Sequence, residues 1–378
     1  MVMLKLLKFD KNLDNWEKVL SIEDLIKPHL RNVTSYDPVD PPEMLAQKAG
    51  VPIDQIIKLN GNENPFGPSE KVSNVVANSN VHVYPDPLQR KVRTKLSEYT
   101  GFTQEYLVAG AGSDELIDLL FRLFIEPGDN ILDFDPTFGM YGFCARIYQA
   151  EVKLSKRDNN FEIDLENALN TINDRTKIIF VASPNNPTGN LASEIQIRAL
   201  LETGVLVVVD EAYYEFCNST FANLIDVFDN LVILRTMSKW AGLAGLRIGY
   251  GIMNPVLVNH IMDIKSPYNL SVTAEDALVA SIDDAGFLLN NVRRILVERD
   301  RVFKLLTGID GLRPIPSSGN YILCEVKDQK KDHVVSGLEN EGIFVRTFNT
   351  EALGNYFRTA IGTPDQSDRM ISVLQQLV

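Results

Sequence analysis

The chain has 378 residues, of which 45% are hydrophobic and 23% charged, a composition typical of an ordinary globular protein with material for a full core. Fifty acidic against 37 basic residues leave a net charge of −13, which argues against nucleic acid and against an anionic membrane surface as partners. This length allows about two or three domains, or one large domain with an appendage.

The cysteines, the histidines and the apolar runs exclude further kinds of protein. The three cysteines are far apart and odd in number, which suggests a reducing compartment and no disulfide framework. The four histidines show no ligand spacing, so we predict no structural or catalytic metal. No apolar run reaches membrane-spanning length, and the opening sequence shows neither a long apolar segment nor a cleavage site. We therefore expect a cytoplasmic protein.

The first part of the chain is predicted to be an arm. A short helical fragment over residues 22–27 is stopped by Pro28, and Tyr36 then begins an extended, proline-rich connector. Such an arm either packs on a neighbouring subunit or is a frayed terminus, and Tyr36 either faces a ligand or only packs within the arm.

Two turn-forming loops follow. A short strand over 56–59 leads into the polar loop 60–65, which is either a plain turn or a rigid loop that presents Asn62 to a ligand. A second loop, 82–87, is held by prolines and precedes a helix over about residues 88–101.

The next segment, over residues 109–124, is predicted to be a turn and an amphipathic helix. A strand ends at Val108, the glycines Gly110 and Gly112 form a tight turn, and Ser113 can cap the helix. The start of such a helix offers free N–H groups and the positive end of its dipole, which suit a phosphate. The third glycine of a dinucleotide fingerprint is missing, so a Rossmann motif is not favoured.

Strands and helices then alternate. Four apolar strands are predicted, at residues 130–134, 177–182, 205–209 and 231–235. Continuous apolar runs suit a parallel sheet that is covered on both faces. Polar side chains follow the ends of these strands, among them Asn186, Asp210 and Lys239. Open α/β sheets bind their ligands at the carboxyl ends of the strands, so we expect a site there.

Beyond about residue 265 the pattern changes to a smaller α+β domain. One long helix, over 285–306, is followed by three short strands and a C-terminal helix; the strands are predicted at 321–326, 342–346 and 356–361. The fold class is therefore α/β, a large domain with a mostly parallel sheet plus a smaller α+β domain. We predict an arm and part of the small domain over residues 1–55, a large ligand-binding domain over 56–268, and the small domain over 269–378.

The groups at the strand ends suit pyridoxal phosphate. A lysine such as Lys239 becomes a nucleophile when apolar and cationic neighbours lower its pKa, and a carbonyl cofactor then captures its amine. A carboxylate such as Asp210 keeps the ring nitrogen of the cofactor protonated, so that the ring accepts electrons. The amide of Asn186 and the phenol of Tyr213 can bond the ring hydroxylate, and Phe138 can stack on the ring.

These residues resemble the fold-type I aminotransferases, over a span from about residue 28 to the C-terminus. The motifs PNNPTG (184–189), DEAY (210–213) and SK…GLR (238–247) occur in the order and at the spacing of that superfamily. The segments NENPFGPS (62–69) and GLAGLR (242–247) are most similar to the histidinol-phosphate aminotransferase family, in particular its cyanobacterial and plastid form.

The resemblance implies a role for each matching position. Lys239 would be the Schiff-base lysine and proton shuttle, Asp210 would pair with the pyridine nitrogen, and Asn186 and Tyr213 would contact the ring oxygen. The phosphate would be surrounded by residues from the helix start and the lysine segment, namely Gly112, Ser113, Asp114, Ser238 and Arg247. The substrate would be held by Tyr36, Asn62, Arg346 and Arg358. Tyr84 would reach the phosphate from the partner subunit, which implies a homodimer.

Phe138 and Trp240 differ from many relatives; at Phe138 stacking survives, but a tyrosine hydroxyl is lost. The implied reaction is the transamination of histidinol phosphate with 2-oxoglutarate in histidine biosynthesis.

Simpler interpretations stay open for single residues. Arg346 or Arg358 alone could be a surface ion-pair residue, Phe138 and Tyr141 could belong to the core, and Asp210 could begin a helix. A neighbouring pyridoxal-phosphate enzyme, such as an aromatic-amino-acid aminotransferase or a threonine-phosphate decarboxylase, would share every cofactor residue. A nicotinamide oxidoreductase would not need Lys239. A transcription regulator on this fold would need an added basic DNA-binding segment.

Overall fold

The computed structural model describes residues 21–378, which divide into two units, residues 21–35 and Tyr36–Val378. The first unit contains the helix α1 (Ile22–Leu25), whose N-terminus is capped by Ser21 through a hydrogen bond from the Asp24 N–H. The second unit contains two main sheets and the helices that cover them, and each unit is described by itself.

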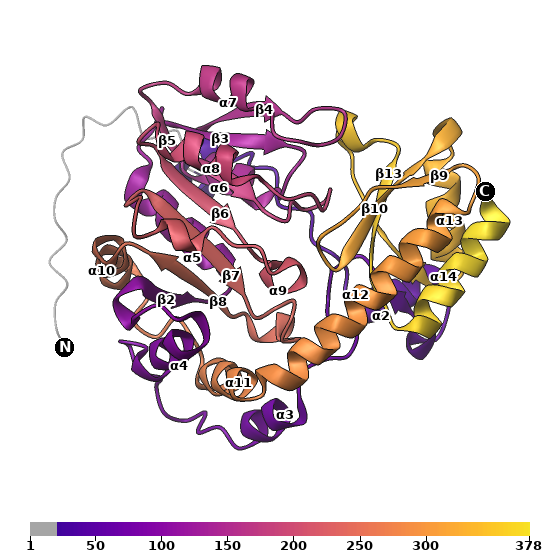
Figure 1. The fold of residues 1–378 in the computed structure, drawn as a ribbon, viewed down its shortest axis with the longest axis horizontal. Coiled ribbons are helices and arrows are strands. Elements are labelled where there is room, and N and C mark those ends of the chain that lie inside the picture. Colours follow the sequence, from indigo (N-terminus) through magenta and orange to yellow (C-terminus); the bar gives the residue numbers. More distant parts are fainter. Residues whose placement is uncertain (1–20) are drawn as a thin grey trace, which may run out of the picture. The chain divides into compact units, whose positions relative to one another are not determined.

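A seven-stranded sheet forms the centre of the larger part of the second unit (Figure 1). Its strands, in spatial order, are β2 (Leu107–Gly110), β8 (Gly249–Met253), β7 (Leu231–Thr236), β6 (Leu206–Asp210), β5 (Thr176–Ala182), β3 (Asn130–Asp135) and β4 (Glu151–Lys156). The pairs from β7 to β4 are parallel, whereas β8 runs antiparallel to both of its neighbours. The prediction of a mostly parallel sheet is confirmed.

Both faces of this sheet are buried except at the edge strand β4, as its continuous apolar strands require. Along β5, Ile179 and Val181 belong to one hydrophobic cluster, whereas Ile178 and Phe180 belong to the other. This alternation follows from the period of two in a strand, which sends successive side chains to opposite faces.

Each face is covered by its own helices. One face carries α5 (Ser113–Phe124), α6 (Met140–Ile147) and α10 (Pro255–Ile264), and the other carries α4 (Arg90–Thr100), α7 (Leu165–Thr171) and α8 (Glu194–Leu201). Near the second face lie α9 (Tyr214–Cys217), α11 (Val272–Asp283) and α3 (Glu70–Ala77), and α11 packs against both α3 and α4.

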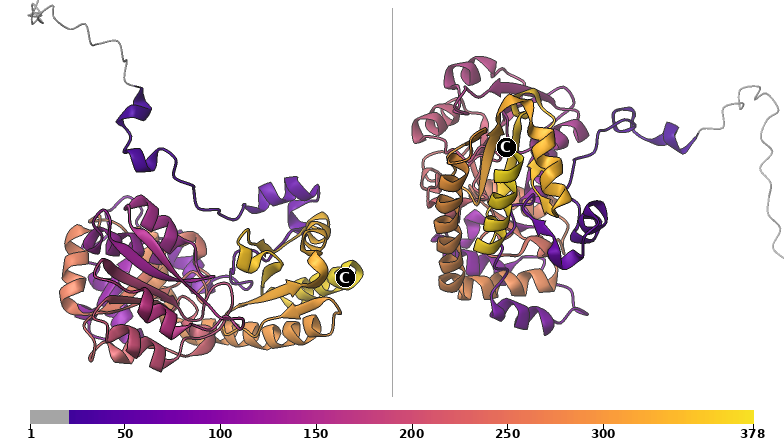
Figure 2. Two further views of the ribbon diagram at one scale, coloured as in Figure 1. Left: turned by 90° about the horizontal axis from the view of Figure 1, so that it is seen from above. Right: turned by 90° about the vertical axis from the view of Figure 1, so that its right-hand side faces the viewer.

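The C-terminal part is built on a smaller antiparallel sheet. Its strands, in order, are β12 (Arg346–Thr347), β13 (Tyr356–Ala360), β10 (Tyr321–Val326) and β9 (Leu312–Pro314). Its helices are α12 (Ala285–Thr307), α13 (Lys331–Asn340), α14 (Pro364–Leu377) and the earlier α2 (Pro42–Ala49). Figure 1 and Figure 2 show the C-terminus on the side of this part that lies away from the large sheet.

The structure corrects several predicted boundaries. The single strand predicted over 342–346 is two short strands, because β11 (Ile343–Phe344) pairs with β1 (Ile57–Lys58), whereas β12 joins the four-stranded sheet. The helix predicted from residue 88 begins two residues later, because Gln89 has a left-handed backbone (φ 54°).

The elements that were not predicted include the helices α2, α3, α10, α11 and α13 and the strands β4, β8 and β9. The domain boundaries near residues 55 and 268 stay a prediction. Within residues 21–378, no helix is both long and apolar enough to cross a membrane.

Candidate active site

The strand ends of the large sheet meet at a cavity of about 160 Å³. Its walls come from the ends of β5, β6 and β7, from the start of α5 and from the segment after β7. Nine predicted site residues line it: Ser113, Asp114, Phe138, Asn186, Asp210, Tyr213, Ser238, Lys239 and Arg247. The structure therefore brings together side chains from five separate segments of the chain.

Lys239 is the partly buried amine of this cavity. Its Nζ donates a hydrogen bond to the Gly61 carbonyl oxygen over 3.1 Å. Burial lowers the pKa of Lys239 to about 8, and the positive charge of Arg358 contributes in the same direction. A substantial neutral fraction near neutral pH is what a nucleophilic amine needs.

Asp210 is the buried carboxylate of the cavity, and only 6% of its surface is exposed. Its Oδ2 accepts a 2.8 Å hydrogen bond from the Tyr141 hydroxyl, and its Oδ1 accepts one from the Ala212 N–H over 3.0 Å. Burial raises the pKa of Asp210 to about 6, while these two hydrogen bonds lower it. Such a carboxylate is suited to a cationic ligand group, because pairing removes the penalty of burying its charge.

One end of the cavity is built for an anion. Ser113 begins the twelve-residue helix α5, so the N–H groups of its first turn and the helix dipole face this end. Arg247 adds a guanidinium that pairs with Asp114 over 2.9 Å. Gly112 has φ +84°, a backbone conformation that favours glycine, and the end of the Arg247 side chain lies against it. Ser238 adds a hydroxyl, held by Thr236 over 3.0 Å.

Two side-chain hydrogen bonds involve cavity residues away from the helix start. Asn62 Nδ2 donates to the Tyr213 hydroxyl oxygen over 2.9 Å, and Arg358 Nη1 donates to Asn186 Oδ1 over 2.6 Å. Arg358 is 6% exposed. Its Nε and the Asn62 Oδ1 are two of the buried side-chain atoms that have no hydrogen-bond partner within residues 21–378. Burial raises the pKa of Tyr213 to about 12, so its phenol stays protonated. Unpaired buried donors and acceptors are costly, so these atoms are suited to a ligand.

The remaining predicted substrate residues lie beside this region. The Tyr36 ring meets Phe138 edge-on, with ring centroids 6.2 Å apart. Arg346 Nη2 donates to the Asp37 carbonyl oxygen over 2.8 Å and pairs with the Asp37 carboxylate over 3.0 Å. Arg346 thus holds the connector that carries Tyr36 close to the cavity.

Tyr84 is the predicted residue that lies apart from the others. It is 78% exposed, and its ring stacks on Tyr268 with centroids 4.5 Å apart. It does not line the cavity of its own chain.

Two residues of the site were not predicted as functional. Thr236 lines the cavity and bonds Ser238, and its only sequence signal is its position two residues before the SK pair. Tyr141, which could belong to the core, is a fully buried core residue whose hydroxyl also donates to Asp210. A contact between residues 69 positions apart has no local signal in the sequence.

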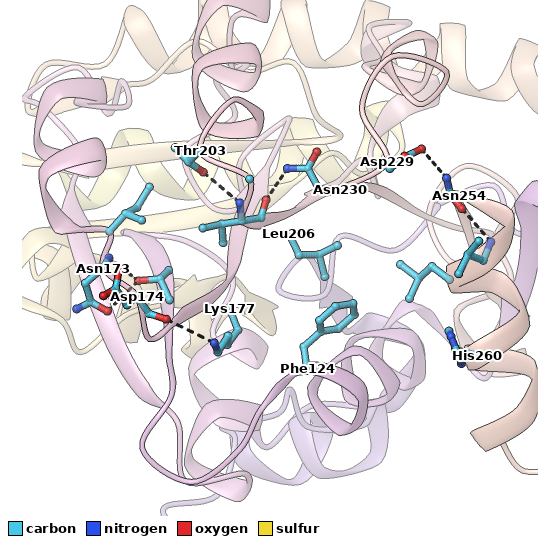
Figure 3. Close-up of a pocket in the computed structure, with 16 residues that line it drawn as sticks. Phe124, Asn173, Asp174, Lys177, Thr203, Leu206, Asp229, Asn230, Asn254 and His260 are labelled. Carbon is cyan, nitrogen blue, oxygen red and sulfur yellow. Dashed lines mark hydrogen bonds between the residues drawn. The ribbon is translucent and has the colours of Figure 1, made fainter.

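A larger cavity, of about 900 Å³, lies at the amino-terminal edge of the same sheet (Figure 3). Two of its amide side chains are engaged locally: Asn254 Nδ2 donates to Asp229 Oδ1 over 2.6 Å, and Asn230 Nδ2 donates to the carbonyls of Leu201 and Val205. None of the described residues that line it is a predicted site residue. It also lies at the edge opposite to the one where open α/β sheets bind ligands, so the smaller cavity is the candidate active site.

Comparisons with known proteins identify the family of this chain. The family model "Aminotransferase class I and II" matches residues 54–374. A curated histidinol-phosphate aminotransferase from Roseiflexus castenholzii is 39% identical, over 94% of this chain and 99% of the relative. The chloroplastic histidinol-phosphate aminotransferase 1 of Arabidopsis thaliana is also 39% identical, over 96% of this chain and 88% of the relative.

A solved structure shows the same fold at low sequence identity. It is the histidinol-phosphate aminotransferase from Sinorhizobium meliloti in complex with pyridoxal-5'-phosphate, with a TM-score of 0.85, 22% identity, and coverage of 93% of this chain and 97% of that chain. With a family model that spans most of its length and relatives at 39% identity, the chain belongs to the class I and II aminotransferases.

Proposed function

We propose that this protein is a pyridoxal-phosphate-dependent aminotransferase that moves the amino group of histidinol phosphate to 2-oxoglutarate, which yields imidazole acetol phosphate and glutamate, as a step of histidine biosynthesis. The observation that carries the proposal is one cavity that combines the amine of Lys239, whose pKa is lowered, with the buried carboxylate of Asp210 and an anion-binding helix start. The curated relatives at 39% identity, which are named histidinol-phosphate aminotransferases, support the choice of substrate.

The residues of the cavity fit pyridoxal phosphate group by group. The start of α5, Ser238 and Arg247 would hold the phosphate, because N–H, hydroxyl and guanidinium groups converge there. Asp210 would hold the protonated ring nitrogen. Asn186 and Tyr213 would hold the ring oxygen, since both line the cavity.

The proposed mechanism assigns the proton transfers to Lys239. When bound, the cofactor supplies a carbonyl that captures amines and a ring that accepts electron density. The Nζ of Lys239 would remove the α-proton of the bound amino donor and later return a proton. Asp210 would supply the negative charge that pairs with the protonated ring nitrogen. Arg358, with its unpaired Nε, and Arg346 would hold the phosphate or carboxylate of the two substrates in turn.

The test is the visible absorbance of the purified protein loaded with pyridoxal phosphate. Histidinol phosphate should convert the cofactor band rapidly, whereas phenylalanine and threonine phosphate, added in parallel, should not. Lys239→Ala should lose both the band and turnover, and Lys177→Ala, a lysine at the opposite edge of the sheet, should retain both. A faster response to phenylalanine or threonine phosphate would keep the cofactor and reject the substrate.

We also propose that the protein is a cytoplasmic homodimer in which Tyr84 completes the phosphate site of the partner. The support is an exposed apolar group around Tyr84, which includes Val81, Val83, Leu88 and Tyr268. Exposed apolar side chains gathered in one place favour burial against another surface.

A mixing experiment tests the shared site. Tyr84→Ala and Lys239→Ala are each expected to be weakly active or inactive alone. In a mixed dimer, one site would combine the intact Lys239 of one chain with the intact Tyr84 of the other, so activity should return on mixing after partial unfolding and refolding. Absence of recovery, with mixed dimers demonstrated by mass, would contradict the crossing of Tyr84.

A further inference from the structure

Tyr141 lies directly behind the proposed ring-nitrogen partner. It is the second residue of α6 and is fully buried, and its ring stacks on Phe180 of β5 with centroids 4.5 Å apart and planes 8° apart. On its other side it meets Phe138 edge-on, at 5.7 Å and 84°. These two aromatic contacts fix the ring, so its hydroxyl has one direction, toward Asp210 Oδ2 at 2.8 Å.

The hydrogen bond has a defined donor. Burial and the nearby Asp210 raise the pKa of Tyr141 well above its ordinary value, so the phenol keeps its proton and donates. With the Ala212 N–H on Oδ1, each oxygen of the Asp210 carboxylate has one protein donor. Both oxygens retain a second lone pair for a ligand, and the plane of the carboxylate is set from two sides.

The hydrogen bond from Tyr141 affects the protonation state of Asp210. Burial is the largest influence on the pKa of Asp210 and raises it. The Tyr141 hydrogen bond is the largest influence that lowers this pKa. The other titratable groups coupled to this carboxylate are Asp114, Glu211, Tyr213 and Tyr321. The two acidic side chains among them also favour protonation, so the hydroxyl of Tyr141 and the Ala212 N–H keep the anion stable.

We propose that Tyr141 is a positioning residue for the cofactor: its hydroxyl orients Asp210 and keeps this carboxylate anionic for the protonated ring nitrogen of pyridoxal phosphate. The inference rests on the proposed function. It gives a specific task to a side chain that sequence patterns leave in the hydrophobic core.

The chain contains a matched control for this hydrogen bond. Tyr148 caps the C-terminus of the same helix, stacks on Phe121 with centroids 5.7 Å apart, and donates to Asp118 Oδ1 over the same 2.8 Å. Neither Tyr148 nor Asp118 lines the candidate active site. Tyr148→Phe therefore removes a hydroxyl that likewise donates to a carboxylate, and that also accepts from Arg122 Nε over 3.2 Å, without touching the proposed cofactor partner.

The experiment compares Tyr141→Phe, Tyr148→Phe and the parent as full-length cofactor-free proteins. The dissociation constant for pyridoxal phosphate is measured by quenching of protein fluorescence over a series from about pH 5.5 to about pH 8.5, a range that brackets the titration of Asp210. Tyr141→Phe should bind about tenfold more weakly near neutral pH, because a hydrogen bond to a charged group is lost. Its affinity should approach that of the parent as the pH rises, whereas Tyr148→Phe should follow the parent throughout.

Two outcomes would overturn the inference. One is Tyr141→Phe with the affinity of the parent at every pH, and the other is a loss that is equal at every pH, which a purely structural role would produce. In an Asp210→Asn background, Tyr141→Phe should have no further effect on affinity, and this double-mutant comparison decides the matter if the single variant folds poorly. If the parent itself does not bind pyridoxal phosphate, the proposed function fails; if only the Tyr141 variants behave as the parent, this inference fails alone.

Discussion

The lowered pKa of Lys239 leads to a quantitative prediction. Burial and the charge of Arg358 lower the pKa of this amine from its ordinary value of 10.5 to about 8. At about pH 8 roughly half of the Lys239 side chains are then neutral, against about 0.3% for a lysine of ordinary pKa, a gain of roughly 150-fold in reactive amine. We therefore expect Lys239 of the cofactor-free protein to react with amine reagents at much lower pH than other lysines.

The assay is brief acetylation of the cofactor-free protein across a pH series, followed by mass spectrometry of the peptides. Lys95 is the internal control, because hydrogen bonds to Asp283 and Glu98 raise its pKa to about 12. The Lys239 peptide should be labelled with a midpoint near about pH 8. Arg358→Met should move that midpoint upward by less than half of the total shift, since burial is the larger cause. A midpoint for Lys239 at or above the ordinary lysine value would refute the reasoning.

Two further predictions concern stability, measured by urea unfolding. Glu211 and Arg235 form a buried ion pair behind the site, with side chains that are 0% and 4% exposed. Glu211→Ala should lower the free energy of unfolding by about 3–5 kcal/mol, because it leaves the charge of Arg235 buried and unpaired. The double change Glu211→Leu with Arg235→Met should cost less than that single change. A loss below about 1 kcal/mol would mean that the pair behaves as an exposed one. Burial raises the pKa of Asp133 to about 7, so the folded state keeps a proton that the unfolded state releases above about pH 4. The free energy of unfolding should therefore fall as the pH rises through this window, by up to about 1.4 kcal/mol per pH unit from this group, and Asp133→Asn should lose this part of the slope; an unchanged slope would assign the effect to other groups.

Local patterns predicted the features that depend on near neighbours in the chain. Apolar runs such as 205–209 became buried strands of the parallel sheet, and the polar residue after such a run, Asp210, lies at the carboxyl end of its strand. The glycine turn before Ser113 also precedes a helix as predicted, because φ +84° at Gly112 and the helical period of the leucines are local properties.

The sequence patterns did not predict pairings between strands that are far apart in the chain. The split of 342–346 depends on which strand each half meets, since β11 pairs with β1 from the start of the chain and β12 pairs with β13. The antiparallel β8 between β2 and β7 is likewise a choice among strands far apart in sequence. Pairing partners are selected by packing over the whole fold, which no window of neighbouring residues contains.

The sequence by itself determined which chemical groups this protein brings to its site: an amine, a carboxylate, an amide, a phenol and an anion-binding helix start, each placed by its own motif. Only the tertiary structure decided their working states. The lowered pKa of Lys239 and the raised pKa of Asp210 come from burial and from partners such as Arg358 and Tyr141, which belong to other segments. Burial and charge are properties of the assembled fold, because they depend on everything that surrounds a side chain in space.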